Sequence, residues 1–182
     1  MRYYVSNCNT THLAVGSAIG ANVFLKICAY STAQISKELK IQVMEEFGEI
    51  PKMKLVNVIG GGSSAAGFWS EFIHYPKNHI ELIGVEAKYC APLTTNAKLA
   101  ILHGAAQYCL TDKNGQIKET HSISAGLDYP GVSPLHCFLK DTGRARYCSA
   151  SDEQALTAFK LVTKLEPSVK PSLEPAHCLH EV

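Results

Sequence analysis

The strongest structural signal in the chain is the sequence Lys54-Leu55-Val56-Asn57-Val58-Ile59-Gly60-Gly61-Gly62-Ser63-Ser64. Its first six residues are rich in branched apolar side chains, which favour a short buried strand. Residues 65–75 then carry apolar side chains in a helical pattern, and residues 80–85 read as a second strand. A strand, a glycine loop, a helix and a strand within about thirty residues form a βαβ unit, whose two strands are parallel. The sequence therefore predicts an α/β fold with a parallel sheet flanked by helices.

Further elements are predicted on both sides of this unit. Residues 31–47 have apolar side chains at every fourth position, which is typical of an amphipathic helix. Residues 144–149 read as a strand, and Ser151 with Gln154 has the spacing of a capping box at the start of a helix that Pro167 ends. A last helix is predicted to begin near Glu174.

Composition limits the class of protein. With 182 residues, 46% of them hydrophobic, the chain is long enough for one domain with a real core. The formal charge of +1 and the absence of a run of Lys or Arg argue against nucleic acid as a partner. The apolar residues 13–25 are too short for a membrane span and do not follow a basic segment, so we expect neither a membrane span nor a signal peptide.

The seven cysteines are widely spaced, odd in number and without a Cys-x-x-Cys pair. This pattern argues against a disulfide framework and a zinc knuckle, so we expect free or buried thiols in a reducing compartment. The nearest approach to metal-ligand spacing is His177-Cys178-Leu179-His180, which lacks a second pair of ligands elsewhere. We interpret it as a pair of histidines on a helix surface.

The triple glycine indicates a phosphate site, because its amides and the positive end of the following helix dipole can point at an anion. A tight turn without a ligand is the simpler explanation. Two kinds of phosphate fit the pattern. Gly60-x-Gly62-x-x-Ala65, with Glu86 after the second strand, satisfies a dinucleotide fingerprint, whereas the serines after the glycines suit a compact monophosphate.

Longer segments carry a family resemblance. Residues 58–67 and 82–86 resemble the phosphate loop of tryptophan synthase beta chains and the strand that follows it. More specific to the family is His121-Ser122-Ile123-Ser124-Ala125-Gly126-Leu127-Asp128-Tyr129-Pro130-Gly131-Val132, of which residues 127–132 particularly resemble plant-type beta chains. Residues 12–20, 141–160 and 171–174 also match in order. The resemblance spans nearly all 182 residues and about half of the family's chain.

The resemblance implies a partial pyridoxal phosphate (PLP) fold-type II domain, with residues 1–182 as a single truncated α/β domain that matches the family's C-terminal half. The family condenses L-serine with indole to L-tryptophan, with PLP as the electron sink. The implied partners are the tryptophan synthase alpha subunit and a second beta chain. The implied location is the cytoplasm or the chloroplast stroma, and no transit peptide is evident in this sequence.

The resemblance also implies roles for individual residues. Asp128 would meet the hydroxyl of L-serine, and Glu174 would lie beside the pyridine ring. The cofactor phosphate would be held by the loop formed by Gly60, Gly61, Gly62, Ser63 and Ser64, with Ala125 and Gly126 as an adjoining wall. A monovalent cation would be bound by backbone carbonyls of Gly60, Tyr129 and Gly131, joined by Gly104. The simpler explanations are that Asp128 initiates a turn and that Glu174 stabilises a helix N-terminus.

Departures from the family pattern bear on activity. The family's Schiff-base lysine lies in a His-Lys-x-Asn motif, and no His-Lys pair occurs in this sequence. Ser64 stands where Asn is common, and Pro175 follows Glu174 where small hydroxylated residues are usual. We therefore expect a chain without catalytic activity by itself, with exposed apolar surface and low stability in isolation. The alternatives are a noncatalytic partner of intact tryptophan synthase subunits and a Rossmann-type nucleotide-binding module.

Overall fold

A computed structural model describes residues 2–5, 21–95 and 97–182, with side chains from residue 32 onward. The match at residues 12–20 and the start of the apolar segment at residue 13 lie outside the described residues. Within the described part, no helix has the length and apolar character needed to cross a membrane.

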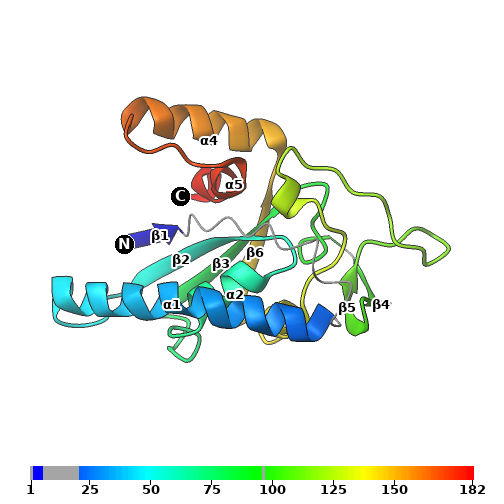
Figure 1. Cartoon of the computed structure of the whole chain (residues 1–182), viewed down its shortest axis with the longest axis horizontal. Coiled ribbons are helices and arrows are strands. Elements are labelled where there is room, and N and C mark those ends of the chain that lie inside the picture. The colour runs from blue at the N-terminus through cyan, green and yellow to red at the C-terminus, as the bar shows by residue number, and fades with distance from the viewer. Residues whose placement is uncertain (1, 6–20, 96) are drawn as a thin grey trace.

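A four-stranded parallel sheet forms the centre of the fold (Figure 1). Its strands are β1 (Arg2–Val5), β2 (Met53–Ile59), β3 (Ile80–Ala87) and β6 (Ala145–Ala150), in the order β1-β2-β3-β6. The βαβ prediction is confirmed, because β2 pairs with β3 in parallel. The strand predicted at residues 144–149 is β6, shifted by one residue.

Helices cover both faces of the sheet. Figure 1 shows α1 (Ala21–Phe47) and α2 (Ser63–Trp69) on one side and α4 (Asp152–Leu165) and α5 (Leu173–Glu181) on the other. Side chains alternate along β2, so that Leu55 packs with Trp69 of α2 in one cluster and Val56 packs with Cys178 of α5 in the other. This two-sided burial explains why β2 and β3 are apolar almost throughout.

Two predicted helix boundaries differ from the structure. The helix predicted at 31–47 begins ten residues earlier, at Ala21, as part of the 27-residue α1. The helix predicted at 65–75 begins at Ser63 and ends at Trp69. Its predicted second half forms turns. There the Arg144 guanidinium donates hydrogen bonds to the carbonyls of Phe72 and Ile73. Arg144 therefore satisfies two carbonyls that a longer helix would have used for its own hydrogen bonds.

Five elements were not predicted, and the first of them is β1 at the edge of the sheet. Strands β4 (Lys98–Leu102) and β5 (Ala105–Cys109) form an antiparallel hairpin, and α3 (Pro134–Asp141) follows the 3-10 turn η1 (Ala125–Leu127). His103 and Gly104 both have positive φ in the hairpin turn, 51° and 76°. That conformation is typical of two-residue hairpin turns, where Asn-Gly is the usual sequence signal.

Candidate phosphate site

The glycine loop lies between the carboxyl end of β2 and the first turn of α2. Gly62 has φ 96°, a left-handed conformation that favours glycine. A Cβ atom at Gly62 would lie 2.2 Å from Cδ2 of His136, and one at Gly60 would lie 2.4 Å from the carbonyl oxygen of Gly126. Close packing against the protein therefore accounts for these two glycines, whether or not a ligand binds.

The donors of this loop fit an anion. The amides of residues 61–65 meet no acceptor among the described residues, and the first helical bond runs from Ala66 N–H to the carbonyl of Gly62. The hydroxyl of Ser64 is buried and also has no hydrogen-bond partner within the described part of the chain. Unsatisfied amides at a helix start, beside an unpartnered hydroxyl, match what a phosphate group requires.

His136 supports the loop from behind and was not predicted. Its Nε2–H donates to the carbonyl of Gly62 at 2.7 Å, and its Nδ1 accepts from the Tyr147 hydroxyl at 2.9 Å. Burial lowers the pKa of His136 to about 4, so the imidazole is neutral near pH 7. The positive potential of the loop therefore comes from its amides and not from this side chain.

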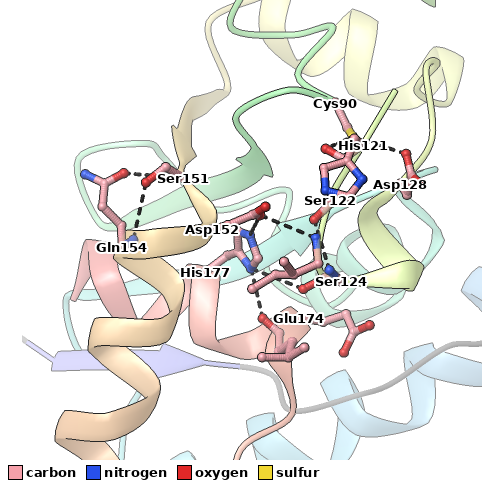
Figure 2. Close-up of polar contacts among 12 residues, drawn as sticks. Cys90, His121, Ser122, Ser124, Asp128, Ser151, Asp152, Gln154, Glu174 and His177 are labelled. Atoms are coloured by element: carbon pink, nitrogen blue, oxygen red, sulfur yellow. Dashed lines mark hydrogen bonds and ion pairs between the residues drawn. The ribbon is translucent and has the colours of Figure 1, made fainter. Parts of the chain in front are cut away.

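Three segments that are distant in the sequence meet at this loop. Gly60 packs against Gly126, and the amide of Gly126 donates to Oε1 of Glu174 at 3.2 Å. Figure 2 shows Glu174 at the start of α5, beside the segment that carries Ser124. The structure thus brings together the glycine loop, the turn that carries Ala125 and Gly126, and Glu174. Glu174 also lies in the first turn of α5, as the helix-dipole explanation requires.

Asp128 follows η1 and faces a cysteine that sequence reasoning did not select (Figure 2). The thiol of Cys90 lies 3.5 Å from Oδ1 of Asp128 and 3.3 Å from the carbonyl of His121. Burial and the neighbouring Asp128 raise the pKa of Cys90 to about 11, so the thiol stays protonated and can donate. No amide of a described residue donates to the Asp128 carboxylate, so the turn explanation finds no support.

The residues of the predicted cation site are placed as follows. The Tyr129 ring stacks on His103 with centroids 6.1 Å apart, and Gly131 pairs with Cys109 in an antiparallel bridge. Gly104 lies in the hairpin turn with open space around it. Nothing in this arrangement tests a bound cation, which stays a prediction.

The prediction of two surface histidines on α5 is wrong for His177. His177 is fully buried, whereas His180 is exposed. Because α5 packs directly on the sheet, His177 points inward. Its Nδ1 lies 2.8 Å from the carbonyl of Leu173 and 3.5 Å from Oγ of Ser124, and its Nε2 lies 3.9 Å from Asp152 (Figure 2). The described residues contain no group of three or more His, Cys, Asp or Glu placed to hold a metal.

Glu86 is not free to bind a ribose, as the dinucleotide interpretation requires. Glu86 is buried at the end of β3, and its two carboxylate oxygens accept from the amides of Leu93 and Thr94 at 2.9 Å. The Thr94 hydroxyl also donates to it at 2.9 Å. A ribose-binding acid needs free oxygens at the ligand. Glu86 instead anchors residues 93 and 94.

Comparison with known proteins defines the class of fold. No family model matches the chain. The structure is similar to a threonine deaminase from T.th., with a TM-score of 0.61 and 16% identity over 83% of this chain and 49% of that chain. Maize serine racemase matches with a TM-score of 0.48 and 17% identity over 78% of this chain and 41% of that chain.

The predicted fold class is confirmed, because the chain has an α/β fold with a parallel sheet flanked by helices that matches a part of the PLP fold-type II fold. It spans about half the length of the threonine deaminase chain that it matches. At 16% identity this likeness assigns the fold and not the reaction.

Proposed function

We propose that this chain is a tryptophan synthase beta-like protein that holds the phosphate of PLP at residues 60–64. The observation that carries the proposal is the meeting of Gly60, Gly126 and Glu174. These residues come from three segments that each resemble the tryptophan synthase beta family. Their convergence is what a shared ligand site would require, and it adds spatial support to a resemblance in sequence.

The residues of the chain would divide the work of binding. The amides of residues 61–65 and the Ser64 hydroxyl would hold the phosphate. The Gly126 amide orients Glu174, whose carboxylate would lie beside the pyridine ring. Asp128, held by the Cys90 thiol, would meet the hydroxyl of L-serine. Bound PLP would supply an electron sink for replacement at the β-carbon of serine.

We further propose that the chain does not catalyse this reaction by itself. The family's lysine motif, His-Lys-x-Asn, has no counterpart in this sequence. Without that amine, cofactor binding would be reversible and proton transfer would lack its usual base. The proposed partners are a tryptophan synthase alpha subunit and a beta chain, and the proposed location is the cytoplasm or the chloroplast stroma.

Fluorescence of the single tryptophan tests the phosphate site. Trp69 lies in α2, which begins directly after the loop, so bound PLP should quench its emission by energy transfer. We expect saturable quenching that inorganic phosphate reverses. The Ser64→Ala variant should bind PLP about tenfold more weakly, because it loses one hydrogen bond to a charged group. Ser70→Ala, at the other end of α2, is the matched control and should bind like the original chain.

Other outcomes separate the alternatives. Quenching that neither phosphate nor Ser64→Ala changes would overturn the phosphate site. A cofactor that borohydride fixes at the loop would show that a lysine of this chain captures PLP, contrary to the proposal. Copurification with the tryptophan synthase alpha subunit tests the finer assignment, whereas tight NAD binding would favour the nucleotide-binding alternative.

A further inference from the structure

A second concavity lies away from the glycine loop. It is lined by residues from two stretches, one between positions 88 and 98 after β3 and one between positions 110 and 118 after β5. Its volume is about 500 Å³, and no residue of the loop, of η1 or of α5 lines it. Pockets of this size bind small molecules in many proteins. The candidate PLP site does not account for it.

The lining of this pocket is strongly basic. Four lysines line it, Lys88, Lys98, Lys113 and Lys118, together with one acidic residue, Asp112. The local excess is three positive charges, whereas the whole chain carries +1. Like charges along a concave wall raise the local concentration of an anion. The pocket is therefore suited to an anionic ligand with several charges.

None of the four lysines is neutralised within the described part of the chain. Elsewhere, Lys40 pairs with Glu71 at 3.2 Å, and Lys54 pairs with Glu81 at 3.4 Å. The pocket lysines have no carboxylate within ion-pair distance among the described residues. The positive charge along this lining is therefore left for an anion from solution to balance.

The segment that carries Lys113 and Lys118 has a defined backbone. Thr111 and Ile117 form an antiparallel bridge, and the Lys118 amide donates to the carbonyl of Leu110 at 2.9 Å. Asp112 accepts the amides of Asn114 at 2.8 Å and Gln116 at 2.9 Å through Oδ1, so that oxygen is committed to the turn. The backbone that carries Lys113 and Lys118 is therefore fixed before any ligand arrives.

We propose that this pocket binds a compact polyanion with two or more phosphate groups. Four ammonium groups from these two stretches of chain exceed what one monophosphate can contact. Lysine binds phosphate oxygens as a compact point charge, so it suits a ligand of this kind. Tyr89, with 61% of its surface exposed, offers an aromatic face at the same pocket. The phosphates can come from a nucleotide or from an inorganic chain, and the aromatic ring separates the two sources.

Isothermal titration calorimetry of the full chain with inorganic triphosphate, ATP and AMP tests the proposal. We expect triphosphate and ATP to bind more tightly than AMP, and about 0.5 M NaCl to weaken both because it screens exposed charges. Lys98→Glu and Lys113→Glu should each weaken binding roughly tenfold. Lys160→Glu and Lys164→Glu, on exposed positions of α4, are matched charge reversals that should leave binding unchanged.

Two further arms assign the ligand and the site. ATP that binds more tightly than triphosphate, with the advantage lost in Tyr89→Ala, assigns a nucleotide, whereas equal affinities assign the phosphates alone. Ser64→Ala should not change triphosphate binding, which separates this pocket from the glycine loop. Failure to bind triphosphate at low salt would overturn the proposal. Equal loss of affinity in the pocket and α4 variants would also overturn it, because it would show attraction by net charge only.

Discussion

The clearest consequence at the scale of single residues concerns Glu86, a carboxyl group in the apolar interior. Burial raises its pKa from 4.5 to about 7, and this effect outweighs the hydrogen bonds from Leu93 and Thr94 that favour the charged form. The neutral carboxyl can donate to the Thr94 hydroxyl, which lies 2.9 Å away. Residues 93 and 94 therefore stay anchored in either protonation state.

This shift predicts a dependence of stability on pH. Between pH 4.5 and about 7, folded Glu86 keeps a proton that the unfolded chain has released, so its contribution to stability falls as pH rises. Glu86→Gln cannot titrate. Relative to the original chain, its free energy of unfolding should rise by roughly 3 kcal/mol across this window. Urea unfolding at several pH values measures the difference.

The difference between the original chain and Glu86→Gln is insensitive to other titrating groups that the two proteins share. His136 has its pKa lowered to about 4, so its contribution is lost as pH falls from 6.5 toward 4. Because this opposite trend is present in both proteins, it cancels in the difference. Parallel stability curves for the original chain and Glu86→Gln would show that Glu86 is ionised in the folded state at pH 5.

At the scale of elements, one arginine joins three of them. The Arg144 guanidinium, just before β6, donates to the carbonyls of Phe72 and Ile73 after α2 and of Ile80 at the start of β3, at 2.8 to 3.1 Å. Its planar fork is what allows one side chain to satisfy three separate acceptors. The turns after α2 are held to the sheet in this way.

We therefore expect Arg144→Lys to lower the free energy of unfolding by about 2 kcal/mol, because a lysine keeps the charge but cannot reach all three carbonyls. Arg146→Lys is the matched control. Arg146 pairs with Glu181 at 2.6 Å, but its side chain is 42% exposed, so we expect a loss below about 1 kcal/mol. Urea unfolding curves of both variants measure the two values. Equal losses would refute a clamp at Arg144.

At the scale of the whole molecule, cysteines are buried in the core on both faces of the sheet. All five described cysteines are free thiols. Cys137 belongs to the cluster beneath α2, Cys90 and Cys178 belong to the cluster beneath α5, and Cys148 is half-buried. The expectation of free or buried thiols is confirmed for these five. Burial raises the pKa of each of them, which keeps the thiols protonated and unreactive.

Alkylation with iodoacetamide, followed by peptide mass mapping, should therefore modify Cys148 first and the four buried thiols much more slowly. Peptides that contain Cys8 and Cys28 are quantified separately. In about 8 M urea all seven should react at similar rates, because burial is lost. Fast labelling of Cys178 in the native chain would show that α5 does not stay docked on the sheet.

Local sequence patterns were sufficient for the central part of the fold. Branched residues in β2 and β3 and the glycines between them carried the βαβ prediction, and the capping box at Ser151 located the start of α4. Candidate site residues such as Gly126 and Glu174 could be chosen only through a family resemblance. Their contact joins residues 48 positions apart, and no local pattern encodes such a distance.

The sequence by itself therefore determined the parallel α/β unit, the glycine loop and the main helices, because each depends on side chains within a few residues of one another. Only the tertiary structure decided where α2 ends and that His177 is buried. It also decided that the Glu86 carboxylate is bonded to residues 93 and 94 and that four lysines line one hollow. The physical reason is that burial and hydrogen-bond partners come from chain packing. A residue's neighbours in space supply most of the free energy that sets its conformation and charge.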